Sequence, residues 1–335
     1  MPRYHRLIFA LLCTALLLLF VADIFFGSIA IPATDVWAAI TGKSADATLR
    51  AIVLDIRLIK ALVALIAGVS LSVSGLQMQT MFRNPLAGPY ILGVSAGASF
   101  GVALFTLGVP LFGISLAPWM ISLGTTGAAW AGAACVMMII VILARRLRDV
   151  MVILILGMML SAALSAVVEI LQYLSNEAAL KSYVVWTMGS LGNVTLGQLA
   201  TMTPIFIIGT MLSIASIKGL NAILLGETSA MTVGINIVAL RRRLYISTTL
   251  LAGTITAFCG PIGFIGLAAP HIARMILRTA DHRTLLPASA LVGCIMLLVA
   301  DLITTTIHLP VNTITALMGI PVVAYIVIRR PNQMQ

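Results

Sequence analysis

The chain has 335 residues, of which 61% are hydrophobic and only 9% carry a charge. An ordinary soluble domain has roughly 25% charged residues, so this composition excludes one. The formal net charge is +10, but the basic residues lie in short clusters between apolar runs. The positive-inside rule and anionic lipid account for such clusters, so nucleic-acid binding is not indicated.

Apolar runs near or above the roughly 18 to 20 residues needed to cross a bilayer recur along the whole chain. They are too long and too evenly apolar for barrel strands, so the sequence predicts an all-α polytopic membrane protein. Its ten predicted spans cover residues 7–27, 58–80, 90–108, 118–144, 150–173, 199–217, 243–260, 262–278, 286–306 and 313–328. The first span is interpreted as an uncleaved helix, with a cleaved signal peptide as the alternative.

The distribution of basic residues predicts the orientation of these spans. If the amino terminus is cytoplasmic, 15 of the 20 Lys and Arg residues fall in inner segments and 5 in outer segments. This bias predicts that both termini are cytoplasmic. The whole chain, residues 1–335, is expected to form one transmembrane domain.

Three connections are too long for simple turns. Residues 28–55 and 175–197 are predicted outside, the first with an amphipathic stretch at 36–40 and the second with a short helix carrying Tyr183 and Trp186. Residues 218–242 are predicted inside, where Gly226 interrupts a moderately apolar stretch. A pair of short interfacial helices joined at Gly226 fits this pattern.

Two helix breaks indicate a transport path, and a glycine stripe lies beyond the first of them. Breaks at Asn84-Pro85 and Gly260-Pro261 leave backbone groups that only protein or a water-filled cavity can satisfy. Glycines at 93, 97 and 101 share one helical face, and close helix packing is the preferred interpretation. The alternative is that the neighbouring Ser95 and Ser99 offer hydroxyl groups to a polar path.

Ionisable groups inside the spans bear on how transport would be driven. Asp23, Glu169 and Asp301 lie near the outer ends of their spans and are interpreted as interfacial anchors. His271 lies deeper and is the best candidate for a proton relay, with a structural histidine as the alternative. A proton-coupled transporter or channel is therefore an alternative function.

No motif for a cofactor, metal or nucleotide stands out. The four cysteines lie inside apolar runs without CxxC spacing, so neither a disulfide framework nor a zinc site is indicated. Gly42-Lys43-Ser44 resembles the end of a phosphate-binding loop, but Trp37 stands where its first glycine should be. We expect no catalytic residue, no metal site and no ATPase in this chain.

A series of motifs resembles one family of permeases. In the first half these are Arg57 to Lys60, the run 83–89 (Arg-Asn-Pro-Leu-Ala-Gly-Pro) and the run 92–98 (Leu-Gly-Val-Ser-Ala-Gly-Ala). In the second half they are 225–227 (Leu-Gly-Glu), 263–267 (Gly-Phe-Ile-Gly-Leu) and 270–274 (Pro-His-Ile-Ala-Arg). From about residue 50 onward the chain thus resembles the FecCD/BtuC-type permeases of iron-siderophore, haem and cobalamin importers.

This resemblance implies a fold, a function and a set of partners. The fold would be that of a BtuC-like type II importer permease, present as a homodimer or as a pseudo-dimer with a related permease. Two cytoplasmic ATPases would bind ATP and magnesium, and an external substrate-binding protein would deliver the cargo. The chain would move its chelate across the bacterial inner membrane by alternating access.

The resemblance also implies roles for particular residues. Coupling to the ATPase would fall to Gly226, Glu227, Thr228, Ala230 and Gly234, and docking of the binding protein to Arg57 and Lys60. The path would be lined by Ser95, Ser99, Ser161, Ser165 and Trp186. The structural motif would comprise Arg83, Asn84, Pro85, Pro89, Gly93, Gly97, Pro270, His271 and Arg274.

The last outer loop departs from the pattern of that family. Thr305 stands where an arginine is usual, and His308 and Asn312 flank a Leu-Pro-Val run where the family tends to have Glu-Leu-Pro-Val-Gly. The contact with a binding protein is therefore expected to differ. The sequence leaves open which of haem, ferric siderophore and cobalamin is the cargo.

Overall fold

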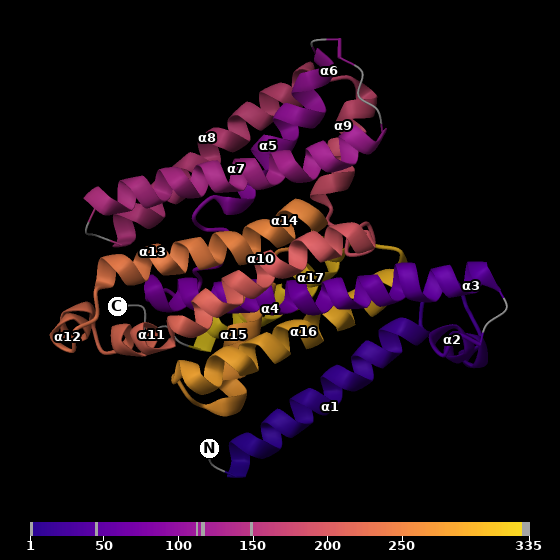
Figure 1. Cartoon of the computed structure of the whole chain (residues 1–335). Coiled ribbons are helices and arrows are strands. Elements are labelled where there is room, and N and C mark those ends of the chain that lie inside the picture. The colour runs from indigo at the N-terminus through magenta and orange to yellow at the C-terminus, as the bar shows by residue number, and fades with distance from the viewer. Residues whose placement is uncertain (1–2, 44–45, 112, 115–117, 148–149, 330–335) are drawn as a thin grey trace. The chain divides into compact units, whose positions relative to one another are not determined.

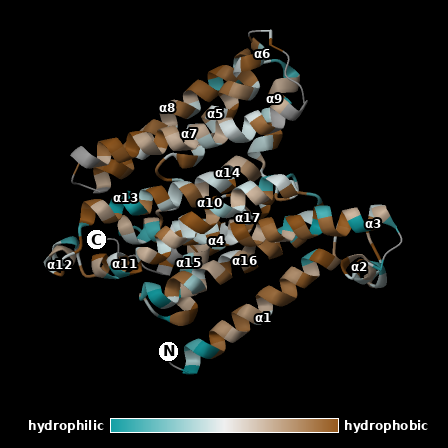
Figure 2. Ribbon diagram, in the orientation of Figure 1, coloured by the Kyte–Doolittle hydropathy of each residue, from teal (hydrophilic) through white to brown (hydrophobic). Residues whose placement is uncertain are grey.

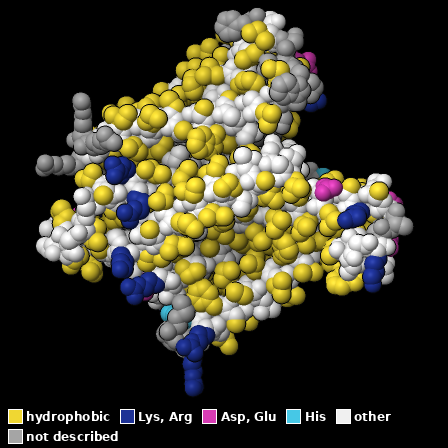
Figure 3. Space-filling model, in the orientation of Figure 1, with side chains coloured by type: hydrophobic (Ala, Val, Ile, Leu, Met, Phe, Trp, Pro, Cys, Tyr) yellow, Lys and Arg dark blue, Asp and Glu magenta, His cyan; other side chains and the backbone are white. Residues whose placement is uncertain are grey.

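The computed structural model describes residues 3–43, 46–111, 113–114, 118–147 and 150–329, and every regular element in these ranges is a helix. Apolar residues dominate the long helices, whereas hydrophilic residues gather on the short helices and at helix ends (Figure 1, Figure 2). Apolar side chains also cover most of the helix surface in view, and Lys and Arg side chains lie near helix ends (Figure 3). An all-helical membrane fold is confirmed.

Each predicted span coincides with a helix or with consecutive helices. Seven are single helices: α1 (Arg3–Phe25), α4 (Ile59–Met81), α7 (Pro118–Arg146), α8 (Val150–Leu174), α10 (Leu196–Ala215), α16 (His282–Ile307) and α17 (Val311–Arg329). The span at 262–278 is α15 (Ile265–Leu277). The other two contain π-helical turns: α5 (Val94–Ala103), η2 (Leu104–Gly108) and α6 (Val109–Leu111); and α13 (Ile237–Thr248), η3 (Thr249–Gly253) and α14 (Thr254–Cys259).

The long connections carry short helices, as predicted. Residues 28–55 contain α2 (Ala33–Ile40) and α3 (Ala47–Ala51), after which η1 (Ile52–Leu58) leads into α4. Residues 175–197 contain α9 (Glu177–Thr187). Residues 218–242 contain α11 (Ile217–Leu224) and α12 (Glu227–Thr232), which meet at Gly226.

The helices divide into two compact units. The first comprises Met1–Val73, Ser190–Pro204 and Ile262–Gln335, and in it α1 packs against α15 and α16 while α17 packs against α15 and α16. A Cβ atom added to Gly68 of α4 would lie 2.5 Å from the Cα of Cys294 in α16. These two backbones can approach so closely only because Gly68 has no side chain. The prediction of a single domain stays a prediction.

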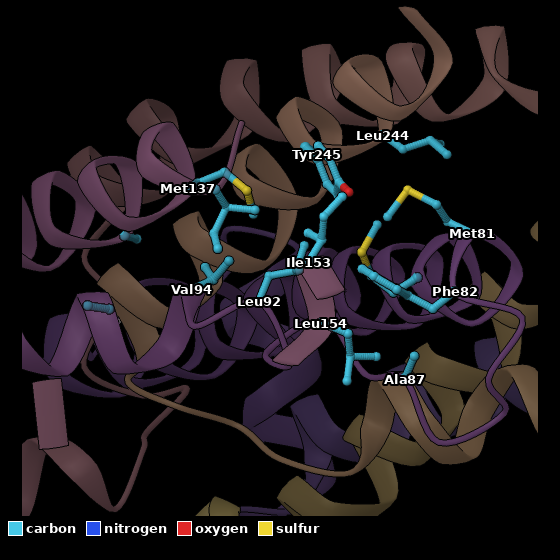
Figure 4. Close-up of a cluster of buried hydrophobic side chains, with 14 of the residues drawn as sticks. Met81, Phe82, Ala87, Leu92, Val94, Met137, Ile153, Leu154, Leu244 and Tyr245 are labelled. Atoms are coloured by element: carbon cyan, nitrogen blue, oxygen red, sulfur yellow. The ribbon is translucent and has the colours of Figure 1, made fainter. Parts of the chain in front are cut away.

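The second unit comprises Ser74–Gly189 and Ile205–Pro261. Its helix α5 packs against both α7 and α8, and a Cβ atom on Gly97 would lie 2.6 Å from the carbonyl oxygen of Gly132 in α7. The packing interpretation of the glycine stripe is therefore confirmed. Figure 4 shows the apolar core of this unit, in which Leu92 and Tyr245 are almost completely buried.

The two predicted breaks are present, and backbone of unusual conformation marks both. Between α4 and α5, Arg83 has φ 48° and Gly93 has φ 82°. The side-chain oxygen Oδ1 of Asn84 accepts a 2.8 Å hydrogen bond from the N–H of Leu86 in this turn. Between α14 and α15, Gly260 has φ 74° and Phe264 has φ 64°.

Candidate functional site

The predicted coupling segment is a helix–turn–helix in the second unit, built around two glycines. Gly226 has φ 114° and ψ 148° at the start of α12, a backbone region open essentially to glycine alone. Gly234 has φ 82° just beyond the end of α12. Its N–H donates to the carbonyl of Met231 and the N–H of Ile235 donates to that of Ala230, which is the Schellman arrangement that ends a helix.

Two arginines fix this segment to its unit. Arg83 donates a 2.9 Å hydrogen bond from Nη2 to the carbonyl oxygen of Ile223, so a cation completes the carboxyl end of α11. Arg241 of α13 places Nη2 2.5 Å from Oε1 of Glu227 in α12. Of this pair the arginine is nearly buried and the glutamate is partly exposed. The ion pair therefore connects the surface of α12 to the body of α13.

The coupling residues divide into buried and exposed ones. Ala230 is completely buried and belongs to the apolar core of the second unit, whereas Thr228 is exposed. Apolar side chains also point outward, and Leu225 is 79% exposed and Val233 69%. We call this set the α11–α12 apolar face: Leu224, Leu225, Met231 and Val233.

A cavity of about 620 Å³ lies beside the same segment. Glu227 and Met231 of α12, Leu147 after α7, and Arg241 and Tyr245 of α13 contribute to its walls. The walls carry one ion pair and many apolar groups, a surface suited to receiving a protein side chain. No cluster of three His, Cys, Asp or Glu residues able to hold a metal occurs among the described residues.

The two predicted docking residues are engaged within the first unit. Arg57 is 4% exposed and donates hydrogen bonds to the carbonyl oxygens of Ile24, Phe25 and Ile29, at 3.1, 2.8 and 2.5 Å. It therefore completes the carboxyl end of α1. The docking role of Arg57 stays a prediction, and it would require these bonds to be exchanged.

Lys60 likewise has partners inside the first unit. Its Nζ lies 2.7 Å from Oδ2 of Asp301 and donates to Oγ1 of Thr305 at 2.9 Å. Asp301 is 2% exposed and Asp23 is completely buried, so the interpretation of these two acids as interfacial anchors is wrong. The sequence did not show that Lys60 and Asp301 are partners, because 241 residues separate them.

The three residues that depart from the family pattern all lie in the first unit: Thr305, His308 and Asn312. Thr305 binds Lys60, as described above. Asn312 accepts a 3.0 Å hydrogen bond at Oδ1 from the N–H of Gly263. His308 adopts φ 58° at the carboxyl end of α16.

The motif residues of α15 lie mostly inside the first unit. Pro270 and His271 are buried, and Arg274 is partly buried. The proton-relay interpretation of His271 stays untested.

Three of the five predicted path residues line a second cavity in the second unit. Ser95, Ser99 and Ser165 contribute to its walls. Ser161 instead donates to the carbonyl oxygen of Gly157 at 2.8 Å. Trp186 is half-buried against the apolar core, with its ring centroid 6.3 Å from that of Tyr183.

Three further residues line that cavity without having been predicted to line a path: Glu169, Gln172 and Tyr183. Glu169 and Gln172 could have been found from their spacing, because residues 165, 169 and 172 share one face of α8 at i, i+4 and i+7. For α9 the resemblance to the family indicated Trp186 as a path residue, but not Tyr183.

Comparison with known proteins decides the family. Residues 15–329 match the FecCD transport family. This chain belongs to that family. The FecCD-family chain is 33% identical over 333 residues to the hemin transport permease HmuU of Yersinia pestis, covering 98% of this chain and 97% of HmuU. It is 36% identical to the vitamin B12 permease BtuC of Salmonella paratyphi A, over 82% of this chain and 83% of BtuC.

Further relatives show the range of the family. The molybdate import permease MolB of Haemophilus influenzae is 30% identical, over 97% of this chain and 96% of MolB. An inward-facing structure of an ABC transporter assigned to the metal-chelate type matches with a TM-score of 0.82 and 28% identity. That match covers 97% of this chain and 99% of the solved one.

The FecCD assignment determines the class of function. The chain is the multi-pass membrane permease of an ABC importer, and it is not the ATPase. Transport is therefore driven by a separate ATP-hydrolysing subunit, and the proton-coupled alternative is not supported. An importer of this kind also works with a substrate-binding protein.

Proposed function

We propose that this permease imports a metal chelate, haem or cobalamin across the bacterial inner membrane, and that the segment from α11 to α12 couples it to the ATPase. Both termini would be cytoplasmic, and two copies of the chain would form the path. The cargo proposal rests on the resemblance to permeases named for haem and vitamin B12. The binding protein would select among these cargoes.

The observation that carries the coupling proposal is the α11–α12 apolar face. Leu225 and Val233 are 79% and 69% exposed on a segment that also carries Glu227 and the hydroxyl of Thr228. Exposed apolar side chains rimmed by polar groups mark a protein or a membrane contact, and the Glu227–Arg241 ion pair beside this face favours a protein. Because the Glu227–Arg241 pair and Arg83 hold this face to its unit, a movement of the ATPase can be transmitted to α13.

Assembly with the ATPase provides the first test. Leu225→Asp should greatly weaken co-purification of the ATPase, because a carboxylate would have to be buried in the contact. Leu196→Asp is the matched control. Leu196 is 63% exposed, begins α10 at the opposite end from α11 and should keep the ATPase bound. Loss of the ATPase in both variants, or in neither, would contradict the assigned contact.

Coupling is tested separately from assembly. Glu227→Gln keeps the shape of the side chain but removes the charge that pairs with Arg241. We expect this variant to assemble but to lose most cargo-stimulated ATP hydrolysis in the complete complex. The same assay, run with haem, a ferric siderophore and cobalamin in turn, identifies the cargo. Full stimulation in the Glu227→Gln complex would rule out the coupling role.

Docking of the binding protein by Arg57 and Lys60 stays part of the proposal with one condition. Both side chains would have to exchange bonds within the chain for bonds with acidic groups of the partner. Single replacements of either residue therefore need a stability measurement beside the binding measurement.

A further inference from the structure

The second unit contains a polar cavity of about 440 Å³ formed by α5, α8 and α9. Its polar walls are Ser95 and Ser99 of α5, Ser165, Glu169 and Gln172 of α8, and Tyr183 of α9. All six belong to a single compact unit.

Local structure arranges these groups as one surface. Ser95 and Ser99 are four residues apart on α5, and Ser165 and Glu169 are four residues apart on α8, so each pair shares a helix face. Tyr183 is 4% exposed, and its hydroxyl hydrogen-bonds the side chains of Ser99 and Gln172. The tyrosine therefore links α5, α8 and α9 in the wall of the cavity.

The protonation of Tyr183 adds to its suitability as a binding group. Burial raises the pKa of the hydroxyl above its usual value, and the hydrogen bonds with Ser99 and Gln172 oppose this only in part. The hydroxyl is thus protonated near neutral pH, and it can donate as well as accept a hydrogen bond.

The position of Glu169 indicates that the cavity does not open to lipid. Glu169 is exposed on α8, a helix long and apolar enough to cross a membrane. A carboxylate facing lipid from such a helix is costly, and acids in membrane helices almost always face a water-filled cavity or a protein partner. This face of α8 therefore meets water or a protein partner, and not lipid.

The charge of the cavity defines what it can hold. Glu169 is its one charged lining residue among the described part of the chain, and no Lys or Arg lines it. An ionised carboxylate accepts hydrogen bonds and never donates them, and the serine, glutamine and tyrosine groups can accept as well. The walls thus favour positive charge and N–H donors, and disfavour carboxylates.

We propose that this cavity is a binding subsite on the cargo path, and that it takes cationic or amide- and amine-bearing groups of the chelate. A cargo whose periphery carries carboxylates would be disfavoured there, so among the proposed cargoes the cavity disfavours haem, which has two propionate groups. The inference rests on the proposed function only in placing the cavity on the cargo path. The selectivity for charge follows from the cavity itself.

The test uses charged thiol reagents of similar size in the full-length chain. The four native cysteines are first replaced by Ala, and Ser165→Cys is introduced. The rates of modification by a cationic trimethylammonium-ethyl and an anionic sulfonato-ethyl methanethiosulfonate are then compared in proteoliposomes. Glu169→Gln in the same background should lower the cationic-to-anionic rate ratio roughly tenfold, because one charge in a cleft concentrates counter-ions.

Glu177→Gln is the matched control. Glu177 is exposed in the first turn of α9 but does not line the cavity, so its replacement should leave the rate ratio unchanged. An equal ratio with and without Glu169 would overturn the proposal, and so would an introduced thiol that fails to react in protein that is still assembled. The reagents require neither ATPase nor cargo, so failure here is distinguishable from failure of the coupling proposal.

A transport measurement connects the subsite to the cargo. In the complete complex, Glu169→Gln should reduce uptake of an amine-bearing ferric chelate several-fold more than uptake of a carboxylate-bearing one. Equal effects on both would show that the cavity does not select cargo by charge.

Discussion

The ammonium group of Lys60 lies 2.7 Å from the carboxylate of Asp301 and joins α4 to α16 within the first unit. Asp301 is almost completely buried, and Lys60 is its ion-pair partner. A residue predicted to bind another protein thus already has a structural task. Replacements at Lys60 will change the stability of the permease as well as any docking.

Replacing one member of the Lys60–Asp301 pair should destabilise the permease more than replacing both. Lys60→Met leaves the charge of Asp301 buried and unpaired, and breaking a buried pair in this way costs about 3–5 kcal/mol. The double variant Lys60→Met/Asp301→Leu should recover much of this loss. Thermal unfolding of the purified permease in detergent measures both, and a double variant as unstable as the single one would contradict the pairing.

The close approach of α5 and α7 predicts a contrast between two glycines. Gly97→Ala would place a Cβ atom 2.6 Å from the carbonyl oxygen of Gly132, and overpacking of this kind costs about 1–3 kcal/mol. Gly127→Ala on α7 meets nothing within 4 Å and should be neutral or slightly stabilising. Unfolding temperatures of the two variants provide the comparison, and equal temperatures would argue against the packing of α5 on α7.

The turn between α11 and α12 should tolerate no side chain at Gly226. With φ 114° and ψ 148°, Gly226→Ala strains the backbone by about 1–3 kcal/mol and should displace α12 from its position. Gly234→Asn is the control, because asparagine tolerates the left-handed conformation of φ 82° at Gly234. Cargo-stimulated ATP hydrolysis should fall sharply in the first variant and persist in the second. The reverse order would be inconsistent with a rigid turn at Gly226.

Arg83 should control the local stability of α11. Arg83→Ala removes the charged hydrogen bond to the carbonyl of Ile223, which is worth about 1.5–3 kcal/mol. Amide hydrogen exchange should then become faster in residues 217–225, with little change in α8. Arg83→Lys should give an intermediate effect, since it retains the charge but not the planar guanidinium. Unchanged exchange in α11 would mean that the bond does not stabilise it.

Some features of the candidate coupling site could be predicted from the sequence, and others could not. The glycines at 226 and 234 could be identified from the sequence because helix ends and turns are local and leave a residue signature. The ion pair between Glu227 and Arg241 could not be identified from the sequence, because several acidic and several basic residues could have paired. Only the packing of α12 on α13 selects this pair.

The path residues also show that spacing along the sequence could not predict which side chains line the cavity. Ser161 and Ser165 lie one helical turn apart, yet only Ser165 lines the polar cavity. Four residues advance a helix by about 6 Å, which is enough to move from the cavity to the neighbourhood of Gly93. Whether α9 contributes to the cavity depends on how the connection at residues 175–197 packs against α5 and α8.

Local signals along the chain were enough to predict the membrane class, a helix or consecutive helices at each of the ten predicted spans, and the short helices between them, because apolar length and helix breakers act within a few residues. Only the packing of the helices showed that Arg57 and Lys60 are used within the chain, and that Glu169, Gln172 and Tyr183 share a cavity. Ion pairs and hydrogen bonds form between groups that are close in space, and most of these groups are far apart along the chain.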